Sequence, residues 1–391
     1  MHRYESKWER ESREQLQKLE PTVITGDREF MKKVFYAGSD LGEVTQILVG
    51  WPAVREAAAL TLVGEKKVDF LDANAGLKKQ ITFSKFIASP LQAVQLDAGG
   101  DYGFLTRDQS GAVNVVLFDK AGQEVWNYPG GVMNGVNGVD DSTVGEVGPD
   151  GKLSVVVGLN GGGGVILVNS QGKKIWQKPE SNVWHVETLD IKGDGHREIL
   201  HTNARGELLV RNATGEVIAH YLPGYYVSHF SLTRWGNESQ PTHILVPTKQ
   251  NKEGCCKNVL QVLGAEGNSV ASLDSPEGDW IHRANGTPVQ QKNNAALYAV
   301  LQTGTLPRSL LSIYNSKGKI TYQEILGDRC LAINTMPGDL ADRLLIGCGN
   351  SVWEYSPLTF KFPVPDSGVD SRMPVAAAET ATALSSLGRP G

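Results

Sequence analysis

The residues best suited to chemistry in this chain are polar side chains that recur at a nearly constant interval. Seven of them, including three consecutive histidines, follow one another at spacings of 46, 45, 48, 44, 53 and 52 residues. Neutral imidazoles bind Zn²⁺ or Cu²⁺ when three of them reach one point. The spacing indicates a ring that forms either a metal or anionic-ligand site or a polar channel whose walls hydrogen-bond water. The ring consists of Gln46, Gln92, Asn137, His185, His229, His282 and Asn334.

A short acidic segment offers a second candidate metal site. Asp190, Asp194 and Glu198, together with the backbone carbonyl of His196, place hard oxygen ligands on a glycine-containing turn, as Ca²⁺ prefers. Lys192 stands where a further carboxylate would be expected, and its ammonium group would oppose a cation. The alternative is a turn capped by aspartate side chains without metal. The sequence identifies no certain cofactor, and Ca²⁺ is the one that this segment suggests.

The adjacent cysteines Cys255 and Cys256 are a third candidate for chemistry. Two neighbouring cysteines can close a vicinal disulfide, and the charged residues around them indicate an exposed loop tip. The alternatives are free thiols or a bridge from this pair to Cys330 or Cys348. The sequence does not choose among these options.

A repeated phrase predicts the elements that position these residues: an apolar strand, a tight turn that ends in glycine, and a second strand. Six copies follow one another at spacings of 46, 50, 43, 52 and 51 residues. A period near fifty residues with four short strands per period is typical of a β-propeller, in which the first strand of each blade lines the central channel. The ring of polar side chains should therefore converge on the channel. The turn glycines are Gly76, Gly122, Gly172, Gly215, Gly267 and Gly318.

The count of repeats predicts an all-β, seven-bladed propeller of four-stranded antiparallel blades. Six blades carry the phrase, and the seventh is a composite because the last unit stops near residue 357 without its outer strand. Residues 21–27 (PTVITGD) are the candidate strand that completes it. Closure matters because an unpaired edge strand exposes backbone donors and acceptors.

The ends of the chain differ in composition from the repeat. Residues 1–20 are highly charged and contain a Trp, and their pattern predicts a short helix. The segment after residue 357 is rich in Pro, Ala, Ser and Thr, and this composition predicts a flexible tail. The expected organisation is a helix and closing segment over residues 1–35, the propeller over 36–357 and the tail over 358–391.

Composition restricts the partners that we expect. The formal net charge is −5 and no Lys/Arg block occurs, which disfavours a nucleic-acid partner. The longest strongly apolar stretch, around residues 57–63, is too short to cross a bilayer, and the first twenty residues do not form a secretory signal.

Two phrases resemble known propeller repeats. Asp119-Lys-Ala-Gly-Gln-Glu-Val-Trp126 and Asn169-Ser-Gln-Gly-Lys-Lys-Ile-Trp176 resemble the repeat of quinoprotein-like (PQQ-like) propellers. The acidic phrase from Asp190 to Glu198 is similar to the loop of FG-GAP, or VCBS-type, propellers. The resemblance implies the fold over roughly residues 40–357 and, because both families are mostly exported, an extracytoplasmic location. It also brings a vicinal disulfide above a quinone cofactor into consideration for Cys255 and Cys256.

No catalytic motif stands out, so the favoured function is a non-catalytic scaffold. We expect it to bind a protein partner through the propeller faces, the N-terminal helix or the C-terminal tail. The alternatives are a metal- or quinone-dependent redox enzyme that uses the channel histidines as ligands or acid–base groups, and an extracellular ligand-binding module stabilised by Ca²⁺.

Overall fold

A computed structural model describes most of the chain. The chain divides into two compact units, residues 1–358 and 359–391, and every described residue belongs to the first unit. The described residues are 22–26, 30–38, 40–50, 59–95, 102–108, 114–131, 133–147, 152–236, 241–252, 255–274, 283–291, 294–303, 308–339 and 341–357.

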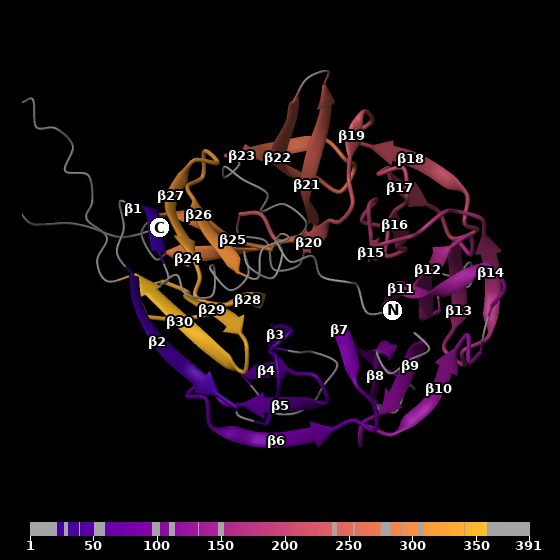
Figure 1. Cartoon of the computed structure of the whole chain (residues 1–391), viewed down its shortest axis with the longest axis horizontal. Coiled ribbons are helices and arrows are strands. Elements are labelled where there is room, and N and C mark those ends of the chain that lie inside the picture. The colour runs from indigo at the N-terminus through magenta and orange to yellow at the C-terminus, as the bar shows by residue number, and fades with distance from the viewer. Residues whose placement is uncertain are drawn as a thin grey trace, which may run out of the picture. The chain divides into compact units, whose positions relative to one another are not determined.

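The described residues form seven antiparallel sheets that surround a hub, as a seven-bladed propeller requires (Figure 1). Blade 1 consists of β3 (Gln46–Val49), β4 (Leu60–Val63), β5 (Lys67–Leu71) and β6 (Leu77–Thr82). Blade 2 consists of β7 (Ile87–Gln95), β8 (Tyr102–Asp108), β9 (Val115–Asp119) and β10 (Glu124–Tyr128). Blade 3 consists of β11 (Val136–Gly145), β12 (Ser154–Gly161), β13 (Val165–Asn169) and β14 (Lys174–Lys178).

The remaining blades follow the same order along the chain. Blade 4 consists of β15 (Val186–Leu189), β16 (Glu198–Thr202), β17 (Leu208–Arg211) and β18 (Val217–Tyr221). Blade 5 consists of β20 (Ser231–Thr233), β21 (His243–Lys252), β22 (Cys255–Leu263) and β23 (Ser269–Leu273), with β19 (Tyr225–Tyr226) paired to β21. Blade 6 consists of β24 (Arg283–Gln291), β25 (Asn294–Thr303), β26 (Ser309–Tyr314) and β27 (Ile320–Ile325). Blade 7 begins with β28 (Cys330–Met336), β29 (Arg343–Cys348) and β30 (Ser351–Pro357).

The ring closes with a different segment from the one that the sequence suggested. The outer strand of blade 7 is β2 (Phe30–Ala37), which pairs antiparallel with β30. The predicted closing segment instead contains β1 (Thr22–Gly26), which pairs with β27 and gives blade 6 a fifth strand. Both segments are extended and lie close together in sequence, so strand pattern alone did not separate the closing strand from the added one.

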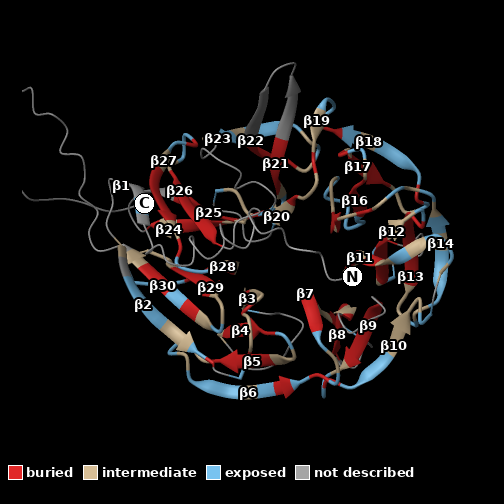
Figure 2. Ribbon diagram, viewed as in Figure 1, coloured by how far each residue is buried: buried red, intermediate tan, exposed pale blue. Residues whose placement is uncertain are grey.

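The middle strands are the most deeply buried part of the blades (Figure 2). The middle strands are buried on both faces, as in β13, where Val165 to Val168 are all 0% exposed. Outer strands are mostly exposed or half-buried, as in β14. The continuous apolar runs of the repeat therefore mark middle strands, which pack against both neighbouring blades.

The repeated turn has a common local structure. The side chain of the first turn residue accepts hydrogen bonds from the backbone amides two and four residues later, as Asn169 does from Gln171 and Lys173. The glycine then adopts a left-handed conformation, with φ of 75° at Gly172. In the first copy, Ala75 occupies the left-handed position with φ of 66°, and Gly76 follows it.

The same turn also contacts the preceding blade. Trp126, in the outer strand of blade 2, donates from Nε1 to the carbonyl of Ser170 in the blade 3 turn at 2.9 Å. Trp176 repeats this contact with Ala213 in blade 4 at 3.0 Å. Both tryptophans therefore lie between neighbouring blades.

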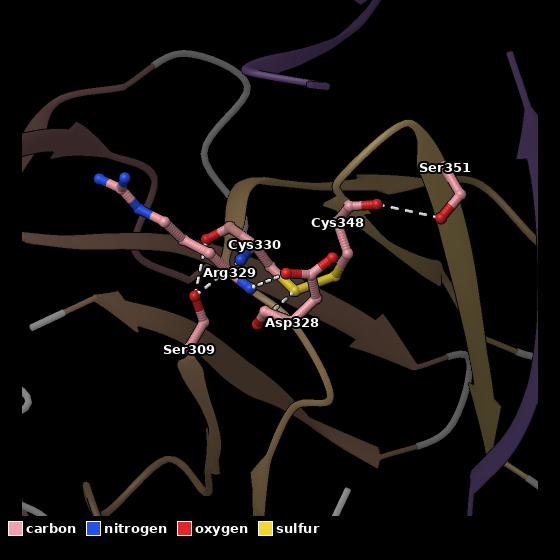
Figure 3. Close-up of a disulfide and its surroundings, with 6 residues drawn as sticks. All are labelled: Ser309, Asp328, Arg329, Cys330, Cys348 and Ser351. Atoms are coloured by element: carbon pink, nitrogen blue, oxygen red, sulfur yellow. Dashed lines mark hydrogen bonds between the residues drawn. A yellow bond between two sulfur atoms is a disulfide. The ribbon is translucent and has the colours of Figure 1, made fainter. Parts of the chain in front are cut away.

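One disulfide lies in the composite blade. Cys330 and Cys348 face each other on β28 and β29 and are bonded (Figure 3). The sequence considered these two cysteines only as partners of Cys255 or Cys256, so it missed this pairing. The side chains of Cys255 and Cys256 lie outside the described part of the structure.

The expected helix over residues 1–20 and the expected tail over 358–391 also lie outside the described residues. Among the described residues the secondary structure is β-strand, and none of them forms a helix long and apolar enough to cross a membrane.

Candidate functional site: the hub cavity

Three members of the predicted ring join neighbouring blades. The side-chain oxygen of Gln46 accepts from the Leu91 amide of blade 2 at 2.9 Å. Gln92 accepts from the Val144 amide of blade 3 at 2.8 Å. Asn334 of blade 7 donates to the carbonyl of Ile47 in blade 1 at 2.9 Å. These amides therefore hold the first strands together around the hub.

One further member of the ring does not join this arrangement. Asn137 is exposed and donates to the side-chain oxygen of Asn160 within blade 3 at 3.0 Å. His282 lies outside the described residues.

The remaining members, His185 and His229, lie side by side at the hub. Their rings stack with centroids 4.2 Å apart and an angle of 24° between planes. Nδ1 of His185 is hydrogen-bonded to a carboxylate oxygen of Asp141 at 2.5 Å, and the edge of Phe230 packs against the same imidazole with centroids 4.5 Å apart. The blade order explains this meeting, because His185 directly precedes β15 and His229 lies two residues before β20.

These histidines line a cavity of about 160 Å³ to which every blade contributes. Arg107 of β8, Asp140 and Asp141 of β11, Glu187 of β15 and Arg283 of β24 bring charge to its wall. One lining residue from each blade, in order, is Thr45, Arg107, Asp141, His185, Phe230, Arg283 and Leu331.

The carboxylates of the cavity have partners. Burial opposes the ionisation of Asp141, but His185, the charge of Arg107 and the amide of Val186 outweigh burial and lower the pKa of this carboxyl. Asp140 accepts from the Asn160 amide at 3.0 Å, and Glu187 accepts from the hydroxyl of Thr143 at 3.2 Å. Burial raises the pKa of Asp140 and of Glu187. The cavity wall therefore presents less negative charge than its three carboxyl groups would carry if all were ionised and unpaired.

Burial has the opposite effect on His229. It lowers the pKa of this imidazole well below its usual range, and the charges of His185 and Arg283 act in the same direction. His229 is therefore neutral near pH 7, so the ring can accept or donate at a nitrogen without carrying charge.

Sequence reasoning missed Asp141, Arg107 and Arg283. In blade 3 it placed the ring at Asn137, whereas the residue that reaches His185 is Asp141, 44 residues before it. A spacing of 44 fits the repeat as well as a spacing of 48 does, so the interval alone did not fix the register. Arg283 directly follows the predicted His282, which places it one residue from the predicted register.

The acidic loop has the geometry of a capped turn. Asp190 accepts from the amides of Asp194 and Gly195 at 3.1 and 2.9 Å, and Asp194 accepts from the amide of His196 at 2.9 Å. Glu198 pairs with the ammonium group of Lys192 at 2.8 Å. Within the described residues, no three His, Cys, Asp or Glu side chains are grouped so that they could hold a metal ion.

Comparisons with known proteins indicate the fold. No family model and no curated protein matches the chain. A structure of BBS1N in complex with ARL6DN, soaked with lead, is 11% identical with a TM-score of 0.51, over 88% of this chain and 99% of that chain. The Pan2 WD40 domain of Neurospora crassa is 9% identical with a TM-score of 0.48, over 84% and 97% of the two chains. BamB from Moraxella catarrhalis is 11% identical with a TM-score of 0.43, over 86% and 96%. At 11% sequence identity, the similarity to BBS1N supports the propeller fold alone and gives no information on the residues of the hub cavity.

Proposed function

We propose that this protein is a non-catalytic propeller that binds a protein partner, and that the partner adds an extended strand to the outer edge of a blade. The observation that carries the proposal is the pairing of β1 with β27. There the chain adds a strand of its own to the edge of blade 6. Strand addition to an open sheet edge is a recurring mode of peptide recognition.

The other outer edges remain open among the described residues. The third residue after the turn glycine is 54% exposed at Val125, 48% exposed at Ile218 and 42% exposed at Val270. The corresponding residue of blade 6, Thr321, is only 8% exposed, and β1 occupies the edge of this blade. An apolar side chain at an unpaired edge suits a partner strand that supplies both backbone hydrogen bonds and a matching apolar residue.

The charged residues of the outer strands distinguish two of these edges as sites for a partner strand. Strands β18 and β23 contain no Lys, Arg, Asp or Glu, whereas β6, β14 and β2 each contain two lysines. Lysine on an edge strand discourages pairing with another chain. We therefore assign the partner strand to β18 or β23.

The resemblance to PQQ-like and FG-GAP propellers and the Cys330–Cys348 bridge together support an extracytoplasmic location, since disulfides persist in oxidising compartments. BBS1N, a chain of similar fold, was crystallised in complex with ARL6DN, so a propeller of this architecture can bind another protein.

The test uses the protein purified with its partner from its native source. We expect hydrogen exchange to slow in β18 or β23 when the partner is bound, and Ile218→Lys or Val270→Lys to reduce partner recovery at least tenfold. Ile175→Lys is the matched control, because β14 already carries two lysines. A partner that leaves exchange in both strands unchanged, or the absence of any stoichiometric partner, would contradict the proposal.

A further inference from the structure

Four asparagines in the chain directly precede a glycine, and in this dipeptide an asparagine side chain reacts readily with its own backbone. The amide nitrogen of the following residue attacks the side-chain carbon Cγ, and glycine favours the attack because it has no side chain and allows many backbone conformations. The attack is easiest where this nitrogen donates no hydrogen bond and the backbone can turn toward the side chain. The four asparagines are Asn134, Asn137, Asn160 and Asn285.

Asn134 lies in an exposed turn that meets both conditions. The amide of Val136 donates to the carbonyl of Met133 at 3.2 Å and closes the turn, whereas the amide of Gly135 donates to no other group in the described part of the chain. Gly135 is exposed, and a Cβ atom there would meet nothing within 4 Å. The Asn134 side chain is exposed as well, so both reacting groups are accessible and little packing restrains them.

The fold opposes the same reaction at Asn160. The amide of Gly161 donates to the side-chain oxygen of Asn182 at 2.6 Å, so the attacking nitrogen is already engaged. The side chain of Asn160 is also fixed, because its Nδ2 lies 3.0 and 3.1 Å from the two carboxylate oxygens of Asp140 and donates to them. Attack at this position therefore requires both sets of hydrogen bonds to break first.

The remaining two asparagines, Asn137 and Asn285, belong to paired strands. Asn137 lies in β11, where the following Gly138 is paired with Asn160 of β12, and its side chain donates to the Asn160 side-chain oxygen at 3.0 Å. Asn285 lies in β24, where the following Gly286 is paired with β25. Strand pairing holds the backbone extended, so a turn toward the side chain would disrupt the ladder of hydrogen bonds.

We propose that Asn134 is a site of spontaneous deamidation, which converts it to a mixture of aspartate and isoaspartate. The Gly135 nitrogen forms a bond to Cγ of Asn134, the bond between Cγ and Nδ2 breaks, and Nδ2 leaves as ammonia with the hydrogen that the Gly135 amide gives up. Water then opens the cyclic imide at either of its two carbonyl groups. The net change consumes one water, releases one ammonia and leaves one new carboxyl group.

The modification changes the start of blade 3. The product adds a negative charge at the turn before β11, the strand that brings Asp140 and Asp141 to the hub cavity. The isoaspartyl form also lengthens the main chain by one carbon at this turn. The protein therefore accumulates a more acidic form with time, independently of the partner strand proposed for β18 or β23.

Peptide mass spectrometry on the full chain, incubated in mildly alkaline buffer, tests the proposal. Asn134 should deamidate at least about fivefold faster than Asn137, Asn160 or Asn285, because each of these must first lose hydrogen bonds. Isoaspartyl peptide should accompany aspartyl peptide, since direct hydrolysis of the side-chain amide yields aspartate alone. In urea, where the fold is lost, the preference for Asn134 should disappear. A smaller preference in the folded chain, aspartate as the sole product, or a preference that persists in urea would overturn the proposal.

Two variants test the cause of the selectivity. Asn134→Gln should abolish the reaction at this position and leave the other sites unchanged, because the longer side chain forms a larger ring more slowly. Asn182→Gly removes the acceptor of the Gly161 amide, and glycine readily adopts the φ of 42° found there. Deamidation at Asn160 should then become faster, and circular dichroism shows whether the variant is folded. An unchanged rate at Asn160 in the folded variant would contradict the protection by hydrogen bonds on which the proposal rests.

Discussion

At the scale of single residues, the surroundings of His201 set its protonation state. His201 lies in the middle of blade 4 and is 0% exposed, with Nε2 accepting from Arg211 at 2.8 Å and Nδ1 facing the carbonyl of Thr202 at 3.2 Å. Burial, followed by the charge of Arg211, lowers its pKa from 6.5 to about 4. The arrangement requires a neutral ring with its hydrogen on Nδ1.

This state makes stability depend on pH. Because the folded pKa of His201 lies below the unfolded value, the unfolded chain takes up a proton first, and stability is lost as pH falls from 6.5 to about 4. The linked loss is about 3 kcal/mol of unfolding free energy. Urea unfolding at several pH values should show this loss in the native chain.

The matched variant is His201→Gln, whose amide can accept from Arg211 and donate to Thr202 without titrating in this range. Its unfolding free energy should fall less than that of the native chain between pH 6.5 and 4. Equal slopes in the two proteins would contradict the assignment of a neutral His201.

At the scale of elements, the glycine of the repeated turn has two structural roles. Gly172 has φ of 75°, and a Cβ atom there would lie 3.0 Å from the Trp126 ring of the preceding blade. The residue therefore provides the left-handed conformation of the hairpin and the space for the inter-blade contact.

Gly172→Ala should destabilise the protein by about 2 kcal/mol, from backbone strain together with displacement of the Trp126 ring. Gly131→Ala is the control, because Gly131 has no positive φ and a Cβ atom there meets nothing within 4 Å. Denaturant midpoints compare the two variants. A Gly172→Ala protein as stable as the Gly131→Ala protein would show that the contact is dispensable.

The composite blade carries a covalent link between its two inner strands. Cys330 and Cys348 are 18 residues apart, and a bridge across a loop of this size stabilises by about 3 kcal/mol through restriction of the unfolded chain. The Cys330→Ala/Cys348→Ala double variant should unfold at a lower temperature than the native chain. A reductant should lower the melting temperature of the native chain but not that of the variant.

At the scale of the whole molecule, stability depends on closure. Blade 7 takes three strands from residues 330–357 and its outer strand from β2, so residues at opposite ends of the propeller form one sheet. Lys32 of β2 also pairs with the buried carboxylate of Glu324 in blade 6 at 2.5 Å. The outer strand of blade 7 therefore fastens two neighbouring blades.

Truncation distinguishes the closing strand from the added strand. A chain that begins at residue 29 lacks β1 but keeps β2, and it should remain a folded monomer with a modest loss of stability. A chain that begins at residue 39 lacks both strands and leaves the edge of β30 open, so it should melt in a broader transition and aggregate. Calorimetry and light scattering report both outcomes, and a cooperative monomer from residue 39 onward would contradict this role of β2.

The sequence by itself determined the repeat, the number of blades and the turn residues, because these depend on interactions within one module or between adjacent modules. The tertiary structure decided which extended segment closes the ring, which cysteines pair, and that Asp141 rather than Asn137 reaches His185. These outcomes depend on distances between residues of different blades, and a shift of one or two residues within a strand, which leaves the repeat interval nearly unchanged, turns a side chain toward the hub or away from it.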